Sequence, residues 1–117
     1  MATARGRRSF WTWGWQSDEP TQAQREEMAR SLSATYGREV VAPSIPDVAD
    51  IELRKPRIAI PSALETVVTH DHTERVIHTY GGHFLELTRA LRGDFAEPPD
   101  AVAYPGTEAE LEQVLDW

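Results

Sequence analysis

The chain has 117 residues, enough for one modest domain, and a hydrophobic content of 40% that is lean for a packed globule. It has no cysteine, which excludes disulfides and thiolate metal sites. No apolar run is long enough to span a membrane, and no apolar segment of a secretory signal follows the first arginines. A cytoplasmic location is therefore expected.

The net charge of −7 lies at one end of the chain. Residues 94–117 hold seven acidic residues and no Lys or Arg, whereas residues 1–93 hold 12 of each sign. Nucleic-acid binding needs clustered positive charge, so this distribution argues against a nucleic-acid partner. The acidic end is either a solvated helix face or a face that meets a basic part of a longer chain.

The first segment combines arginines with tryptophans. Residues 1–9 are polar and are predicted to form a disordered arm. In the following "FWTWGW", Trp11, Trp13 and Trp15 recur at a spacing of two, which in an extended segment places three indoles on one side. Such an apolar load needs a surface to cover.

The clearest helix begins after Thr21, an N-cap with Gln24 at the capping-box position, and ends at Gly37. Its apolar stripe is narrow, which places the helix on the surface. The stripe consists of Met28, Leu32 and Tyr36, with Ala29 beside it.

Residues 38–60 contain three prolines and are predicted to form an irregular connector over the surface, with a brief strand at 57–60. Three short helices follow and are expected to form a compact cluster. The first covers residues 61–71, the second runs from an Asp71 cap to Gly81–Gly82, and the third covers residues 83–93. Phe84, Leu87, Thr88 and Leu91 are expected to share one face of the third helix.

The last unit, "DAVAYPGTEAELEQVLDW", reads as a strand at 101–104 followed by a helix with a capping box at Thr107 and Glu110. Its predicted buried stripe is Leu111, Val114 and Leu115. A strand followed by a helix is half of a βαβ unit and needs a second, parallel strand. The pattern thus predicts that the protein continues beyond Trp117.

The chemistry-bearing residues form no recognisable site. The four histidines, His70, His72, His78 and His83, lack metal-ligand spacing, which favours ordinary surface or capping roles over a metal site. Gly81–Gly82 follows a predicted helix rather than a strand, which favours a helix-to-helix turn over a phosphate loop. Arg89 and Arg92 could reach an anion, although Glu86 suggests a local pair. No catalytic, cofactor-binding or metal-binding residue is predicted.

Two stretches resemble a known family. "FWTWGWQSD" resembles the W-G-aromatic opening of alkyldihydroxyacetonephosphate synthases and their bacterial FAD-linked oxidase relatives. "PPDAVAYPGTEAELEQVLDW" is similar to the first strand and helix of their FAD-binding domain, of the vanillyl-alcohol oxidase type. The resemblance covers about residues 10–117. Tyr80 precedes Gly81 where the synthases have a His-Gly pair, which favours a broader oxidoreductase class.

The resemblance implies an α+β fold: a disordered arm at 1–9, a mainly helical N-terminal extension at 10–97, and an incomplete FAD-binding domain beginning at 98–117. It implies the N-terminal fragment of an FAD-dependent oxidoreductase, in which this segment is scaffold rather than catalytic and does not itself bind FAD. The expected partners are the remainder of the FAD-binding domain and a second copy in a homodimer. The alternative is a small helical interaction module with a Trp-rich docking arm.

Overall fold

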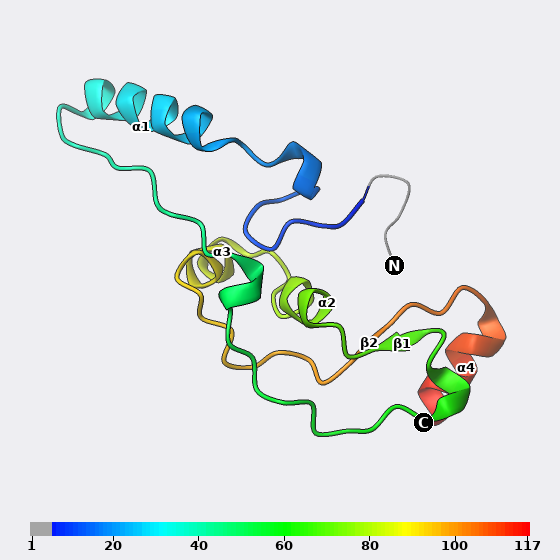
Figure 1. Cartoon of the computed structure of the whole chain (residues 1–117). Helices are drawn as coiled ribbons and strands as arrows, with labels where there is room; N and C mark the ends of the chain where they lie inside the picture. Colours follow the sequence, from blue (N-terminus) through cyan, green and yellow to red (C-terminus); the bar gives the residue numbers. More distant parts are fainter. Residues whose placement is uncertain (1–5) are drawn as a thin grey trace.

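In the computed structural model, which describes residues 6–117, helix α1 (Gln22–Tyr36) projects from the rest of the chain (Figure 1). The predicted capping box of Thr21 and Gln24 is present, and Gly37 ends the helix with a φ of 62°. Glycine takes this left-handed conformation without a steric cost. Ala29 is buried while the predicted apolar stripe is exposed, which confirms that α1 lies on the surface.

Helix α2 (His72–Ile77) starts where the sequence predicts and ends earlier. The Asp71 side chain accepts a hydrogen bond from the backbone N–H of Glu74 at 2.9 Å and caps the first turn. The helix ends before the Gly81–Gly82 pair, which forms part of the turn leading to the next helix. The glycines therefore join two helices, as predicted.

Helix α3 (Phe84–Leu91) begins after a histidine cap, which is one of the roles expected for the histidines. His83 is the N-cap, and the Glu86 carboxylate accepts the His83 backbone N–H at 2.9 Å. The face shared by Phe84, Leu87, Thr88 and Leu91 is not the most buried one, because Phe84 is 65% exposed while Ala90 is the fully buried residue of α3. A small residue at that point lets the helix backbone approach its neighbours closely.

The hydrophobic core lies between α2, α3 and the irregular segments around them. Val76 of α2 is 1% exposed, Ile51 of the connector 4%, and Phe95 after α3 3%. The Phe95 ring packs against Phe10 and Tyr80, with centroid separations of 6.1 and 5.4 Å. The connector at 38–60 is irregular as predicted, but it does not run only over the surface, because Ile51 is part of the core.

A small antiparallel sheet joins distant parts of the chain. Strand β1 (Val68–Thr69) pairs with β2 (Val102–Ala103), with Val68 opposite Ala103. The helix predicted over residues 61–71 was wrong: one 3₁₀ turn at Ser62–Leu64 precedes β1, since β-branched residues favour an extended chain. The strand predicted at 57–60 does not form either, and Arg57 donates its backbone N–H to Asp100 instead.

The Trp segment is bent, so its three indoles do not share one side as predicted. The Ser9 N–H bonds the Gly14 carbonyl at 2.9 Å, and Arg8 forms an isolated antiparallel bridge with Trp15. Consequently Trp11 is only 9% exposed whereas Trp13 is 73% exposed. Of the arm predicted to be disordered, residues 1–5 lie outside the described residues, and Arg7 and Ser9 make backbone hydrogen bonds.

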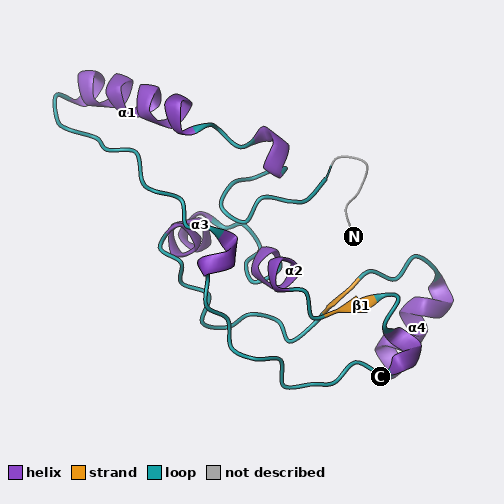
Figure 2. Cartoon of the chain, viewed as in Figure 1, coloured by secondary structure: helices purple, strands orange, loops and turns teal. Residues whose placement is uncertain are grey.

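The described residues form a small α+β protein of four α-helices and one two-stranded sheet, joined by long loops (Figure 2). Helix α4 (Glu108–Asp116) lies at the opposite end of the molecule from α1 (Figure 1). The principal extents are 58 × 30 × 22 Å, and the radius of gyration is 17.6 Å. A compact chain of this length would have a radius of about 13–14 Å, so the molecule is elongated and carries surfaces that pack on nothing within the described chain.

Candidate functional site

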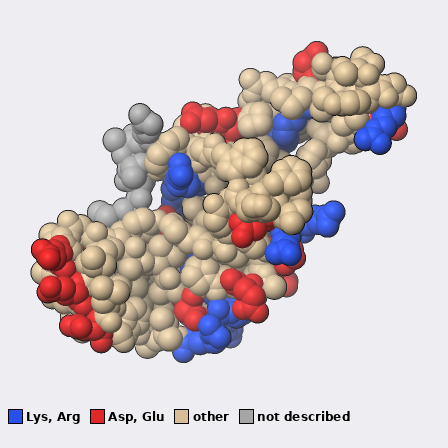
Figure 3. All heavy atoms as spheres, turned by 180° about the vertical axis from the view of Figure 1, so that it is seen from behind, with Lys and Arg blue, Asp and Glu red and all other residues tan. Residues whose placement is uncertain are grey.

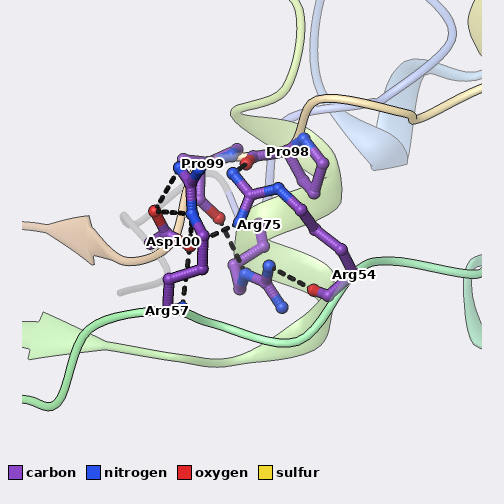
Figure 4. Close-up of polar contacts among 6 residues, drawn as sticks. All are labelled: Arg54, Arg57, Arg75, Pro98, Pro99 and Asp100. Carbon is purple, nitrogen blue, oxygen red and sulfur yellow. Dashed lines mark hydrogen bonds and ion pairs between the residues drawn. The ribbon is translucent and has the colours of Figure 1, made fainter.

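The segment that leads into β2 is held by three arginines (Figure 4). Arg54 donates to the Pro98 carbonyl at 2.6 Å and to the Asp100 carboxylate at 2.5 Å. The buried Arg75 donates to the Pro99 carbonyl at 2.8 Å and to the Arg54 carbonyl at 2.7 Å. We call this set, Arg54, Arg57, Arg75 and Pro98–Asp100, the arginine clamp.

Arg57 completes the clamp with a forked contact. Its Nη2 lies 2.8 Å from Asp100 Oδ2, and its Nε lies 3.1 Å from the same oxygen. Hydrogen bonds from Arg57, and next from Arg54, hold the pKa of Asp100 well below its usual range. The same contact raises the pKa of Arg57, first through the hydrogen bond and then through charge attraction. The carboxylate of Asp100 is therefore a fixed anion that ties the clamp together.

A second polar network fixes the end of β2 to α2. The Tyr104 hydroxyl donates to the buried Glu74 carboxylate at 2.5 Å and lies 3.3 Å from His78 Nε2. The guanidinium of Arg7 lies 3.4 Å from the other Glu74 oxygen. Burial, followed by the hydrogen bond to Glu74, raises the pKa of Tyr104 to about 12. Tyr104 is therefore a neutral hydroxyl donor at ordinary pH.

Helix α4 follows the segment held by the Tyr104 network, and none of its own residues is buried. The predicted capping box of Thr107 and Glu110 is present. The stripe predicted to be buried is instead open: Leu111 is 45% exposed, Leu115 is 75% exposed and Val114 is intermediate. The two-residue strands β1 and β2 offer too little surface to cover a helix. An unpartnered apolar face thus follows a strand that is firmly anchored.

The four histidines lie apart in separate local roles. His72 Nε2 contacts the Val48 carbonyl at 3.0 Å, His78 belongs to the Tyr104 network, and His83 caps α3. His70 Nε2 is buried and has no hydrogen-bond partner among the described residues. Within residues 6–117, no three His, Cys, Asp or Glu side chains are grouped so that they could hold a metal ion.

The glycine pair borders a cavity of about 510 Å³ between the Trp segment and the turn after α2. The Trp13 indole donates to the Gly82 carbonyl at 2.5 Å and closes one side. A Cβ at Gly82 would come within 3.4 Å of the Trp13 ring. The φ of 91° at Gly82 favours glycine, which gives this position a backbone role in the turn without a bound phosphate.

The local pair of Glu86 with Arg89 that the sequence suggested does not form. The Glu86 carboxylate is used in the α3 capping box, and no ion pair of Arg89 or Arg92 occurs among residues 6–117. Both arginines are exposed on or just after α3. The structure does not bring them together with the clamp.

Sequence reasoning missed the arginine clamp and the Tyr104 network. One available signal was the pairing of a cationic "RKPR" with an acidic "PPD", since consecutive prolines leave carbonyls without adjacent N–H donors. Arginine is well suited to bind both such carbonyls and a carboxylate. The Glu74 side chain also lies in the Tyr104 network, although its position three residues after the Asp71 cap is equally typical of an ordinary first helical turn.

No helix within residues 6–117 has the length and apolarity required to cross a membrane. Comparison of the chain with protein-family models, with curated proteins and with solved structures finds no match.

Proposed function

We propose that this chain forms the N-terminal scaffold of an FAD-dependent oxidoreductase similar to alkyldihydroxyacetonephosphate synthases and FAD-linked oxidases. The observation that carries the proposal is the exposed apolar face of α4, with Leu111 and Leu115 open directly after an anchored strand. A strand followed by an amphipathic helix is the unit that opens a larger α/β sheet. In this proposal the flavin-binding part of the same polypeptide covers the exposed apolar face of α4.

The described residues do not fit FAD themselves. A flavin pyrophosphate is held by backbone N–H groups in a Gly-rich loop that joins a strand to a helix. The glycine pair here joins α2 to α3, and the Trp13 indole occupies the space beside Gly82. The role proposed for this chain is therefore structural: it packs against the flavin-binding part and contributes no catalytic residue.

In the proposed scaffold, the arginine clamp holds the segment before β2 against the helical body. It fixes Pro98–Asp100 to Arg54, Arg57 and α2, so β2 and α4 leave the helical body in one direction.

By resemblance, the substrate class would be an acyl-dihydroxyacetone phosphate or a 2-hydroxy acid. We also propose a cytoplasmic location, since the chain has no cysteine that would depend on an oxidising compartment.

Two measurements test the proposal. The 117-residue chain, titrated with FAD at micromolar concentration, is expected to give no saturable flavin quenching. The genomic reading frame past the codon for Trp117 is expected to continue into a strand and a Gly-rich loop, and the longer polypeptide to purify with FAD. Stoichiometric FAD binding by residues 1–117 alone, or a longer polypeptide without flavin, would refute the proposal.

A second candidate function is a small interaction module with a Trp-rich docking arm. It is favoured by the projection of α1, beside which an apolar pocket of about 230 Å³ lies between Met28, Leu32 and residues 40–43. Trp13 is also largely exposed next to the body. A stop codon directly after Trp117, with no flavin-domain sequence downstream, would favour this candidate over the scaffold.

A further inference from the structure

An acidic ridge runs the length of α4. Glu108, Glu112 and Asp116 are spaced four residues apart, which places them one above another on a helix. All three are exposed, and none of their carboxylates has a hydrogen bond or ion pair with any residue in the 6–117 range. Figure 3 shows acidic side chains gathered at the end of the molecule where α4 lies, without basic side chains among them.

The exposed leucines form a second ridge beside the acidic one. Leu111 lies three residues after Glu108, and Leu115 lies three residues after Glu112, so each leucine neighbours a carboxylate on the helix surface. Leu111 is 45% exposed and Leu115 is 75% exposed. The face of α4 that lacks a partner is therefore half apolar and half anionic.

The acidic ridge is unfavourable for α4 alone. Like charges four residues apart repel each other. Asp116 lies in the last turn, where the helix dipole favours a cation, and no basic residue is present in that turn. Residues 94–117 contain no Lys or Arg that could compensate. A cationic surface placed against the ridge would offset both costs, because each carboxylate would gain an opposite charge.

We propose that this face of α4 docks a basic amphipathic helix whose leucine-like side chains meet Leu111 and Leu115 and whose Lys or Arg side chains meet Glu108, Glu112 and Asp116. The proposal rests on the proposed function, because it assigns that helix to the flavin-binding part of the same polypeptide. It adds the charge and the side-chain pattern that the covering surface must have.

The first test uses the 117-residue chain and two synthetic helical peptides. One peptide carries Leu at i and i+4 with Lys along the adjacent ridge, and the other carries Glu in place of Lys. The Lys peptide is expected to bind, to shift the amide resonances of α4 and to lose at least about tenfold in affinity when salt rises from about 0.05 to 0.5 M. Equal binding of both peptides, or binding of neither, would overturn the proposal.

Matched variants locate the binding face. The variant Glu108→Gln/Glu112→Gln/Asp116→Asn is expected to lose at least about tenfold in affinity for the Lys peptide. Leu111→Ala/Leu115→Ala is expected to lose a similar factor. The control Glu39→Gln/Glu52→Gln/Glu65→Gln changes the net charge equally at exposed positions elsewhere and is expected to bind normally. An equal loss in the control would mean that net charge alone attracts the peptide.

The longer polypeptide distinguishes the source of the docked helix. If its own flavin-binding part covers α4, the Lys peptide should bind it at least about tenfold more weakly than it binds the 117-residue chain. Equal binding, or a dimer of the 117-residue chain abolished by Leu115→Ala, would show a different occupant and overturn the assignment. A longer polypeptide that excludes the peptide yet lacks FAD would refute the proposed function, while the docking of a basic helix from the same polypeptide on α4 would stand.

Discussion

Asp100 accepts hydrogen bonds from the side chains of Arg54 and Arg57 and from one backbone N–H. Its lowered pKa means that folding favours the ionised carboxylate. The stabilisation is therefore complete above the ordinary pKa of about 4 and is lost as pH falls through the lower pKa of the folded state. Asp100→Asn is expected to lower the melting temperature at pH 7 and to flatten its fall between about pH 4 and pH 2.

Asp116→Asn is the matched control for this experiment, because the Asp116 carboxylate is exposed and unpaired within the described chain. Its melting temperature should not fall at pH 7. Parallel melting curves for wild type and Asp100→Asn across the acid range would contradict the role of the clamp in stability.

Two phenylalanines allow core packing to be measured with the same substitution at a buried and an exposed position. Phe95 is 3% exposed and contacts Phe10 and Tyr80, whereas Phe84 is 65% exposed. Phe95→Ala is expected to lower the free energy of unfolding by about 3–5 kcal/mol in urea denaturation. Phe84→Ala should change it by no more than about 0.5 kcal/mol. Equal effects would mean that the core is not centred on Phe95.

At the scale of elements, the two terminal units differ in how firmly they are held. No residue of α4 is buried, whereas α3 contains Ala90 at 0% exposure. A helix of nine residues is marginal in water without tertiary contacts. Amide hydrogen exchange is therefore expected to be fast from Thr107 onward and slower in α3.

A cap variant sharpens the exchange experiment. Thr107→Ala removes one partner of the capping box and should cost the helix about 1 kcal/mol, which makes exchange in α4 faster still. The α3 amides should be unchanged. Protection in α4 equal to that in α3 would show that α4 packs on the body of this chain.

Elements with local signals were predictable and those with distant partners were not. The caps at Thr21, Gly37 and Thr107 depend on residues within three or four positions, so the sequence alone carries them. Strand β1 has two residues and shows no alternating pattern, and only its pairing with β2, far along the chain, defines it. The prediction that the three tryptophans share one side was wrong for a related reason. Residues at a spacing of two lie on one side only when the backbone is extended, and this segment is bent.

The candidate site likewise has parts that could be predicted from local sequence and parts that depend on distant contacts. The apolar positions of α4 were readable from their helical spacing, but their exposure depends on what packs against them. The arginine clamp joins residues 21 to 46 positions apart, and no local pattern specifies such a contact. The role of Arg75 could not be predicted from the sequence, because it donates to backbone carbonyls and such partners correspond to no sequence motif.

At the scale of the whole molecule, the radius of gyration of 17.6 Å is the quantity to measure. Helix α1 projects from the body and α4 extends from its other end (Figure 1). Small-angle X-ray scattering of the 117-residue chain should give a radius near 18 Å, beyond the roughly 13–14 Å of a compact chain of this length. A value near 14 Å would mean that α1 folds back on the core in solution. In that case the Leu32→Glu variant, which places a charge on the apolar stripe of α1, should have a larger radius of gyration than the wild type.

The arginine clamp also bears on the order in which the molecule acquires its shape. Helices α2 and α3 depend on contacts between near neighbours in sequence, whereas Asp100 reaches back to Arg54 and Arg57 across the whole intervening chain. Contacts of that separation form only after the chain between them is ordered, because loop closure costs entropy before any bond repays it. The two ridges of α4 therefore acquire a fixed direction late in folding. The partner helix proposed above would therefore dock on a body whose long-range contacts have already formed, so that folding precedes assembly.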